Sequence, residues 1–349
     1  MLVVVCVAVV AIAIAGQDGS KKFVAPQRVK GHGKVTIAWV GDMALSAERG
    51  LPDDGGRSLF RDVKPLLSSP GLTAGNLEGT LGSAGVPKCP VGTPNCFAFQ
   101  APARYARRYK AAGIDLMNLA NNHAFDYGVL GSASTRAALG AAGLLYTGLP
   151  GQITLVRHRR LTVAFVGFAS YAWAALITDL DGVRALVTAA SQRADIVVAL
   201  MHAGGEGAAQ GRTPVGHEFA FGEDRGDTRA FAHTAIDAGA DLVLGSGPHV
   251  IRGMERYRER LIAYSVGNFL GYHTFGLGGP LSESAILKVR LDQDGRFQSG
   301  RWISIRLRPP GIPERDPDHR SAAHMADLSA QDFGAAAVTV KRRGRLGVR

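Results

Sequence analysis

Five short polar clusters contain the residues of this chain that could do chemistry, and each directly follows an apolar run. In chain order, the clusters are Gly41-Asp42, Asn76-Leu77-Glu78, Asn121-Asn122-His123 with Asp126, His202, and Pro248-His249. Carboxylate and amide oxygens together with imidazole nitrogens are the ligands that hard and borderline divalent ions prefer. No two clusters are close enough in sequence to form a site alone. The pattern therefore predicts a metal-dependent, hydrolase-like centre assembled from distant parts of the chain.

These clusters need a scaffold, and the rest of the sequence predicts one of alternating strands and helices. Strand patterns cover residues 35–40, 72–75, 114–119, 161–168, 195–200, 241–244, 261–266, 284–291 and 302–307. Helix patterns cover residues 58–67, 101–112, 132–142, 181–192 and 228–238. Apolar strands that alternate with helices are typical of an α/β sheet covered on both faces. Ligands bind such sheets beyond the carboxyl ends of the strands, which is where all five clusters fall.

Composition places the chain among ordinary globular proteins with an excess of positive charge. The 349 residues are 46% hydrophobic and 20% charged, and the formal net charge is +11. A basic balance favours an anionic partner, which could be a polyanionic polymer, a phosphate ester, an anionic membrane surface or nucleic acid. The alternative is solvated charge on loops. No basic stripe interleaved with aromatic residues is present, so nucleic acid is the least favoured partner.

The amino-terminal segment predicts export. Residues 2–15 form an apolar run that is too short to span a bilayer, which takes about 20 residues. The run ends in Ala13-Ile14-Ala15, a small-x-small pattern that signal peptidase accepts. We expect residues 1–15 to be a signal peptide or a short membrane anchor and residues 16–34 to be a linker; a buried strand is the alternative. The positive region expected before the run is missing, so we expect the natural start to lie upstream of Met1.

The cysteines agree with an exported protein. Without the leader, which contains Cys6, the chain keeps an even pair, Cys89 and Cys96, in a stretch rich in turn residues. We expect a local disulfide between them, worth about 2–3 kcal/mol because its loop is short. Two free surface thiols are the alternative. The main domain is expected to cover residues 35–310, and the Pro-, Asp- and Arg-rich residues 311–349 are expected to form a basic, poorly ordered tail.

Several longer motifs together resemble one family. In order, they are Gly41-Asp42, Asn76-Leu77-Glu78-Gly79, residues 118–128 (NLANNHAFDYG), residues 201–207 (MHAGGEG), Gly247-Pro248-His249-Val250 and residues 264–269 (YSVGNF). They resemble the CapA family of bacterial capsule or poly-γ-glutamate biosynthesis proteins over roughly residues 35–307. This resemblance implies a calcineurin-like metallophosphoesterase fold, an α/β four-layer-type sandwich of mixed sheets flanked by helices.

The resemblance also implies roles for individual residues. The metal ligands would be Asp42, Glu78, Asn122, His202 and His249. Catalysis would fall to His123, beside the leaving group, and to Asp126. The cofactor would be one or two divalent ions, Mn, Mg or Zn, with Glu78 able to bridge two. Such a centre clamps an attacking hydroxide and the anionic oxygens of an ester, while a nearby imidazole donates a proton.

Two ligands of the usual phosphoesterase set are missing. Ala44 stands where the first motif usually has a histidine, and Gly247 where the last motif usually has one. The site could therefore hold one ion, borrow Glu206 or Glu218, or bind weakly. A further group is expected to contact substrate or support the ligands, with ordinary structural or surface roles as the alternative: Asn76, Asn121, Glu206, Glu218, Glu223, Arg225, Ser265 and Asn268.

Structural explanations also exist for the site residues themselves. Asp42 could be a helix N-cap, and the Asn121-Asn122-His123 segment could be a tight turn. His202 could be an ordinary buried histidine, and Pro248-His249 could be turn chemistry alone.

The resemblance implies an exported or membrane-anchored protein that acts on or binds an anionic polymer such as poly-γ-glutamate or other capsule material. Capsule-synthase membrane subunits and the membrane surface are candidate partners. Two alternatives stay open: a non-catalytic, polymer-binding scaffold of the capsule machinery, and a general exported metallophosphoesterase. Turnover of phosphate esters and γ-glutamyl substrates would separate them.

Overall fold

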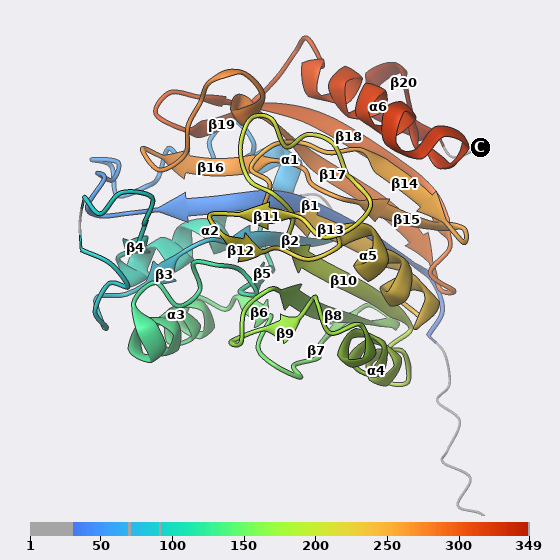
Figure 1. Cartoon of the computed structure of the whole chain (residues 1–349), viewed down its shortest axis with the longest axis horizontal. Coiled ribbons are helices and arrows are strands. Elements are labelled where there is room, and N and C mark those ends of the chain that lie inside the picture. The colour runs from blue at the N-terminus through green and yellow to red at the C-terminus, as the bar shows by residue number, and fades with distance from the viewer. Residues whose placement is uncertain (1–30, 69–70, 91, 348–349) are drawn as a thin grey trace, which may run out of the picture. The chain divides into compact units, whose positions relative to one another are not determined.

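The computed structural model describes residues 31–68, 71–90 and 92–347 (Figure 1). The leader expected at residues 1–15 and the linker as far as residue 30 lie outside these residues. Two mixed sheets dominate the described chain. The ten-stranded sheet contains β20 (Thr339–Lys341), β21 (Arg345–Gly347), β18 (Phe297–Arg308), β17 (Glu283–Asp292), β1 (Lys34–Leu45), β2 (Leu72–Leu77), β5 (Leu116–Asn118) and β6 (Leu145–Thr147) in this spatial order, with β16 (Asn268–Tyr272) on β1 and β19 (Ile312–Arg315) on β18.

The second sheet has seven strands. Their spatial order is β14 (Met254–Tyr257), β15 (Arg260–Ala263), β13 (Leu242–Ser246), β10 (Ile196–His202), β8 (Leu161–Ala169) and β7 (Thr154–His158), with β9 (Ala175–Leu176) on β8. Two small pairs complete the strands: β3 (Thr80–Leu81) with β4 (Gln100–Ala101), and β11 (Phe219–Ala220) with β12 (Glu223–Asp224). In both large sheets the centre is parallel and an outer part is antiparallel. The parallel strands bring their carboxyl ends to one edge.

The described residues form four layers. The helices are α1 (Lys64–Leu67), α2 (Ala106–Ala112), α3 (Gly128–Ala141), α4 (Leu180–Ser191), α5 (Thr228–Asp237) and α6 (Arg320–Phe333). One apolar core lies between the two sheets, a second packs the ten-stranded sheet against α1, α2 and α3, and a third packs the seven-stranded sheet against α4 and α5. The predicted α/β architecture of mixed sheets flanked by helices is confirmed.

The period-2 pattern of β1 explains the layering. Val35, Ile37 and Trp39 point into the core between the sheets, while Ala38 and Val40 point to the helix-covered face. Successive side chains of a strand alternate between faces, so a strand buried on both sides must be apolar throughout. This is why the strand patterns in the sequence are nearly continuous apolar runs.

The prediction of a poorly ordered tail from residue 311 is wrong. The described part of this segment contains β19, α6, β20 and β21, and α6 lies against the sheet beside β18 (Figure 1). Ala322, Met325 and Leu328 place one apolar face of α6 in the core between the sheets. The high charge content of the segment belongs to the other face, so composition alone was misleading. The boundary at residue 310 therefore does not end the domain, because residues 31–347 belong to one compact unit.

The structure also tests the predicted helix at residues 58–67 and the predicted disulfide. Only the last turn of the helix expected over residues 58–67 is α-helical, and α1 begins just before Pro65. Proline fits the first turn of a helix, where its missing N–H costs nothing. The disulfide between Cys89 and Cys96 is present. Within the described ranges, no helix is both long enough and apolar enough to span a membrane.

Candidate metal centre

The five polar clusters converge where the parallel strands of both sheets end. Asp42 lies in β1, next to Asn76 of β2 on one side and Asn268 of β16 on the other. His202 is the last residue of β10 and pairs with Ser246 at the end of β13. Glu78 follows β2 directly, and His249 lies in the turn after β13, beyond Gly247 and Pro248. The clusters therefore lie at or near the carboxyl ends of these strands, although Asp42 lies inside β1, which continues to Leu45.

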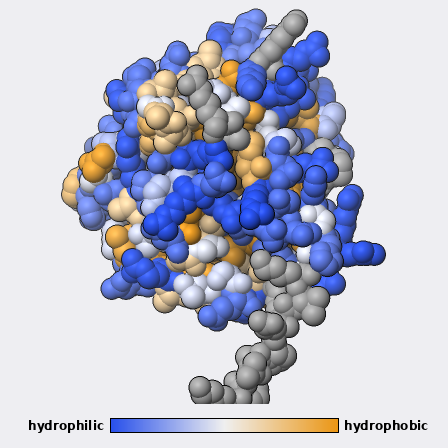
Figure 2. Space-filling view, turned by 90° about the vertical axis from the view of Figure 1, so that its right-hand side faces the viewer, coloured by the Kyte–Doolittle hydropathy of each residue, from blue (hydrophilic) through white to orange (hydrophobic). Residues whose placement is uncertain are grey.

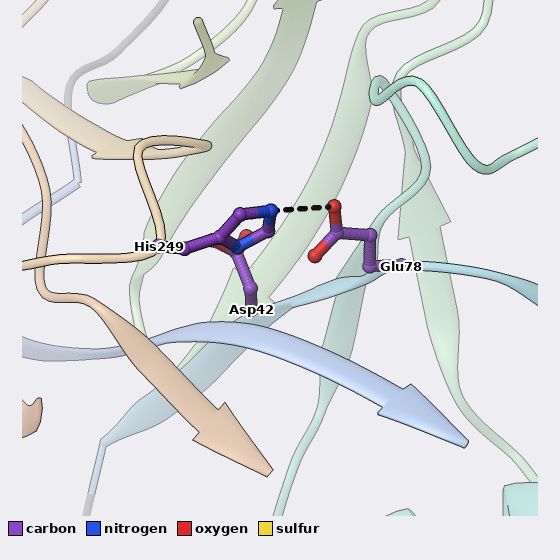
Figure 3. A group of neighbouring side chains, drawn as sticks. All are labelled: Asp42, Glu78 and His249. Carbon is purple, nitrogen blue, oxygen red and sulfur yellow. Dashed lines mark ion pairs between the residues drawn. The ribbon is translucent and has the colours of Figure 1, made fainter. Parts of the chain in front are cut away.

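Glu78 is the common neighbour of three histidines. Its Oε1 atom is 3.7 Å from His202 Nε2, 3.7 Å from His249 Nε2 and 3.9 Å from His123 Nε2. Figure 3 shows the His249 ring turned toward the Glu78 carboxylate, with Asp42 beside them. Ligand atoms about 2.0–2.2 Å from one cation are themselves roughly 3–3.5 Å apart. The spacing around Glu78 thus suits a shared ion after small movements.

Polar partners hold the other ring nitrogen of each histidine. His123 Nδ1 is 2.7 Å from Asp126 Oδ2, and His249 Nδ1 is 2.9 Å from Asn268 Oδ1. His202 Nδ1 lies 3.3 Å from Ser246 Oγ and 3.4 Å from Asp42 Oδ1. Metal-binding histidines are usually oriented in this way, because a partner on one nitrogen fixes the ring and leaves the other for the ion.

Asp42 is fully buried and held from several sides. Asn76 Nδ2 donates to its Oδ1 at 2.8 Å, and the backbone N–H of Gly247 donates to its Oδ2 at 3.1 Å. Burial opposes its ionised form, but hydrogen bonds from His202 and His249 outweigh burial and hold the pKa of Asp42 well below its ordinary value. This aspartate is a carboxylate at any physiological pH. Its partners come from other strands, which excludes the helix N-cap explanation.

Buried polar atoms without partners show that the donor set fits a cation. Among the described residues, both carboxylate oxygens of Glu78, Nε2 of His202 and Oδ1 of Asn122 have no hydrogen-bond partner. Leaving such atoms unsatisfied costs about 1–3 kcal/mol each. One ligand atom from each of Asp42, Glu78 and His249 also lies within 4.8 Å of the others. A divalent ion would satisfy these atoms, so the chemistry of the donors matches the predicted cofactor class.

The ionisation of the ion-free site makes metal affinity depend on pH. Burial raises the pKa of Glu78 well above its ordinary value, and the carboxylates of Asp42 and Glu206 raise it further. Burial works against a charged His249, but Glu78 and Asp42 outweigh burial and raise the pKa of His249 to about 10. At neutral pH the ion-free site therefore carries a proton on His249 that a bound ion must displace.

We expect apparent Mn²⁺ or Zn²⁺ affinity to rise with pH, by roughly tenfold per unit while one proton is displaced. Affinity should rise with pH because deprotonation of His249 frees a ring nitrogen for the ion. Titration calorimetry in buffers of different ionisation enthalpy measures the proton release directly. Affinity that stays constant with pH, with no proton released, would contradict the assignment of His249 as a ligand.

His123 and Asp126 form a buried pair beside the centre. Asp126 also accepts the backbone N–H of Phe99 at 2.6 Å, and Lys88 Nζ lies 2.8 Å from its Oδ1. Burial lowers the pKa of His123, against the opposing effect of Asp126. His123 is therefore a neutral imidazole with its Nδ1–H bonded to Asp126 and its Nε2 lone pair turned toward Glu78. Such a group can accept a proton and later return it.

The two expected gaps in the ligand set are real. Gly247 has a φ of 116°, and a Cβ atom there would lie 2.8 Å from the backbone nitrogen of Ala203. Only glycine tolerates both the positive φ and the close approach. Ala44 is fully buried and has no donor atom. Neither position can supply a ligand, and the centre depends on the donors around Glu78.

Glu218 cannot replace either of the missing metal ligands. It lies in a buried ion pair in which Arg252 Nη2 is 2.6 Å from Oε2 and Nη1 is 2.8 Å from Oε1. The backbone N–H of Gly205 and the hydroxyl of Thr228 bond the same carboxylate. All of its hydrogen bonds are therefore structural. The interpretation of Glu218 as a borrowed ligand or substrate contact does not fit this geometry.

We expect Glu218→Ala to lower the free energy of unfolding by about 3–5 kcal/mol, because it leaves the buried Arg252 guanidinium unpaired. Metal content should be unchanged. Chemical denaturation measures the first quantity and elemental analysis the second. Asp181→Ala is the matched control, since its pair with Arg184 is exposed and worth at most about 1 kcal/mol. Lost metal with unchanged stability would restore the ligand interpretation.

Some of the other predicted residues hold the candidate ligands in place, and the rest line a neighbouring hollow. Asn76 Oδ1 accepts from Asn121 Nδ2 at 3.2 Å, and Asn121 Oδ1 accepts the His123 backbone N–H at 3.0 Å. Ser265 Oγ accepts a hydrogen bond from the Gly267 N–H at 3.1 Å and donates one to the backbone oxygen of Val250. Ser265 therefore stabilises the backbone around Gly267. Asn268 positions His249, as described above. These side chains support the centre, and Asn268 also lines a hollow next to His249.

A hollow of about 380 Å³ opens beside His123 and contains the remaining predicted residues. Asn122 Nδ2 lies 3.4 Å from Glu206 Oε1, and Arg225 Nη1 lies 2.6 Å from the same oxygen. Arg225 is also 3.2 Å from Glu223 Oε2 at the more exposed rim. Glu206 Oε2 is 3.7 Å from His249 Nε2, so Glu206 links the hollow to the centre.

Sequence reasoning missed several residues of this site. Asn118 donates to Asn76 Oδ1 at 3.0 Å, and Trp173 donates to the Asn121 backbone oxygen at 2.9 Å. Lys88 and the stacked rings of Phe125, Trp173 and Tyr171 line the hollow. Asn118 was visible as the first residue of the longest motif. Phe125 also lies in that motif, whereas Tyr171 and Trp173 lie in a separate loop with no marked spacing.

Comparisons with known proteins agree with this arrangement. The fold and donor set define an α/β protein with a candidate divalent-metal centre at the carboxyl edge of its sheets. The chain belongs to the family described as bacterial capsule synthesis protein PGA_cap, whose model matches residues 36–273. The resemblance stated from the motifs is thereby confirmed.

Three relatives illustrate the family. The chain is 27% identical to "PGA biosynthesis protein CapA" of Bacillus subtilis, over 76% of this chain and 70% of the relative. It is 26% identical to "Capsule biosynthesis protein CapA" of Bacillus anthracis, over 78% and 67%. It is 31% identical to "Probable polyglutamine synthesis accessory protein Rv0574c" of Mycobacterium tuberculosis, over 55% of this chain and 54% of the relative.

Two solved structures show a weaker likeness. One is "Putative 5'-Nucleotidase from Staphylococcus aureus", with a TM-score of 0.47 and 12% identity over 85% of this chain and 58% of that one. The other is a 5'-nucleotidase precursor from Thermus thermophilus, with a TM-score of 0.41 and 14% identity over 86% and 59%. This chain spans less than two thirds of either structure.

Proposed function

We propose that this protein is a metal-dependent hydrolase of capsule polymer biosynthesis that acts outside the cytoplasm on an anionic polymer such as poly-γ-glutamate. The observation that carries the proposal is the convergence of three histidine Nε2 atoms on the unpartnered, fully buried carboxylate of Glu78. Membership of the capsule synthesis family supplies the biological setting. The names of the relatives support poly-γ-glutamate and, with it, an extracytoplasmic location.

The donors divide into ligands and a proton-transfer pair. Asp42, Glu78, Asn122, His202 and His249 would hold the divalent ion, which supplies Lewis-acid polarisation of a carbonyl or phosphoryl oxygen and acidifies bound water. His123 would take a proton from the attacking water through Nε2 and pass it to the leaving amine or alcohol. Asp126 keeps the His123 ring in the required orientation through the 2.7 Å contact with Nδ1. Elemental analysis of the purified protein gives the number of ions per chain.

Two cations of the hollow could contact an anionic group of a substrate. Lys88 and Arg225 both line it, together with the carboxylates of Glu206 and Glu223, which pair with Arg225. Arg225 is almost fully buried, and among the described residues its Nε atom has no hydrogen-bond partner. A buried guanidinium with an unsatisfied N–H favours binding of a carboxylate or phosphate. In poly-γ-glutamate this group would be the α-carboxylate next to the γ-amide that is cleaved.

A second candidate function is a non-catalytic subunit that holds the polymer for membrane-bound capsule synthase. The observation that favours it is the absence of donor side chains at Ala44 and Gly247, which reduces the ligand set. A general exported phosphoesterase is a third candidate, favoured by turnover of phosphate esters alone.

Turnover assays separate these functions. Purified protein is incubated with a phosphomonoester, a phosphodiester and poly-γ-glutamate in the presence of Mn²⁺, Mg²⁺ or Zn²⁺. The proposal predicts metal-dependent shortening of poly-γ-glutamate, followed by size-exclusion chromatography and amine release. If the protein binds the polymer but hydrolyses no substrate with any of the three ions, the scaffold function is supported. Hydrolysis of phosphate esters with no effect on the polymer supports a general phosphoesterase.

A further inference from the structure

One hollow on the described surface is strongly basic and lies away from the metal centre. It measures about 780 Å³ and lies over β1, β17, β18 and β21. Its cationic lining residues are Lys288, Arg290, Arg301, Arg343 and Arg345, and no Asp or Glu is among its lining residues. Thr36 lines it from β1. Thr36 is six residues from Asp42, so the hollow is about 20 Å along the strand from the centre.

The strand pattern explains why this face is open. Leu287, Val289 and Trp302 point into the core between the sheets, so the alternating positions Lys288, Arg290 and Arg301 point to the other face. Farther along, that face is apolar and belongs to the core beneath the helices α1, α2 and α3. The sheet therefore has a helix-covered part and a basic part, and the basic part is hollowed.

Three cations stand directly opposite one another across three strands. Lys288 of β17 pairs with Arg301 of β18, and Arg301 pairs with Arg345 of β21. Neighbouring strands are about 4.8 Å apart, so this row spans about 10 Å. Like charges directly opposite each other destabilise a sheet. Burial, with a contribution from Arg301, holds the pKa of Lys288 below its ordinary value. An anion bound beside Arg301 and Arg345 would reduce the repulsion between these two guanidinium groups.

The surroundings of the row favour a linear polyanion over a membrane or nucleic acid. None of the exposed large hydrophobic residues of the described chain lines the hollow, so it offers no apolar anchor for a bilayer. No aromatic residue lines it either, which leaves no platform for stacking bases. The side on which β1 begins, at right in Figure 1, faces the viewer in Figure 2, where hydrophilic residues cover most of the surface.

We propose that the hollow over β1, β17, β18 and β21 is a second binding site, which holds an anionic polymer chain through the row Lys288, Arg301 and Arg345. The choice of a polycarboxylate such as poly-γ-glutamate rests on the proposed function, whereas the preference for an anionic chain rests on the row itself. A polymer held at this site keeps its other segments at high local concentration near the protein. The site would therefore act as a tether that is separate from the metal centre.

The test is binding of fluorescein-labelled poly-γ-glutamate, followed by fluorescence anisotropy at constant ionic strength. The double variant R301A/R345A should bind at least 10-fold more weakly than the wild type. The control R107A/R193A removes the same charge from two exposed arginines elsewhere, and it should change affinity by less than twofold. Thermal unfolding should show that R301A/R345A is folded, and the charge reversal R301E/R345E should weaken binding further. Equal losses in the test and control variants would overturn the proposal, because net charge alone would then explain binding.

Two further arms separate this site from the metal centre and from a membrane. Asp42→Ala with EDTA should still bind the polymer, since the row is intact. If Asp42→Ala removes binding and R301A/R345A does not, the polymer binds at the metal centre alone: the tether is wrong and the proposed function stands. If R301A/R345A loses binding to vesicles of phosphatidylglycerol but keeps binding to the polymer, the site is a membrane contact, and the proposal is overturned.

Discussion

Glu78→Gln should lower the affinity for Mn²⁺ or Zn²⁺ by at least about 100-fold, more than a change to a residue that merely supports a ligand. The reason is geometric, because Glu78 Oε1 lies within 3.9 Å of Nε2 of all three histidines. Titration calorimetry gives the affinity, and elemental analysis of the purified protein gives the metal content. Glutamine keeps the size of the side chain and removes the charge that attracts the ion.

The same variant should change stability in opposite directions with and without metal. Burial raises the pKa of Glu78 above its value in the unfolded chain, so its ionised form destabilises the ion-free fold at neutral pH. Ion-free Glu78→Gln should therefore unfold at a higher temperature than ion-free wild type. With excess ion the order should reverse, because the wild type binds the ion more tightly and gains more binding free energy than the variant.

Glu255→Gln is the matched control for the measurement of metal affinity. Glu255 is also a buried glutamate next to a histidine, with His233 Nε2 3.0 Å away, but it lies outside the centre. Its replacement should leave metal affinity unchanged. Equal metal affinity in Glu78→Gln and wild type would contradict the assignment of Glu78 as the central ligand.

His123→Ala should lower metal-dependent turnover by about 10²–10⁴-fold, the usual contribution of a positioned acid–base group. Metal content should remain close to that of wild type, because the predicted ligands are untouched. Asp126→Asn should give an intermediate loss, since it weakens the 2.7 Å contact that orients the ring. The measurement is turnover of the substrate that the assays above identify, at saturating ion.

His324→Ala provides the control for this prediction. His324 also pairs with a carboxylate, Glu283, at 2.8 Å, but it lies on α6 and outside the centre. Its replacement should leave turnover unchanged. Full activity in His123→Ala would exclude proton transfer by His123, and loss of metal in the same variant would make it a ligand instead.

Much of the centre could be predicted because its donors follow strands. A buried parallel strand is a nearly continuous apolar run, so the position where Asp42, Asn76 or His202 appears at its end is visible in the sequence. All parallel strands of a sheet end at one edge, which is enough to bring such residues together. The type of donor then restricts the chemistry to divalent ions.

The parts that were not predicted depend on contacts between distant segments. The ion pair of Glu218 with Arg252 joins residues 34 positions apart, and no local pattern identifies it. The row of Lys288, Arg301 and Arg345 depends on the register between three strands. Composition misjudged α6, because a charged helix with one narrow apolar face has the same average as a disordered tail.

The most direct test of the account is a crystal structure of the protein grown with Mn²⁺ and measured at an energy where manganese scatters anomalously. The account predicts an anomalous peak within bonding distance of Glu78 and of Nε2 of His202 or His249. The number of peaks gives the number of ions. Strong manganese peaks elsewhere, with none between Glu78 and these histidines, would contradict the central claim that the five clusters form a metal centre.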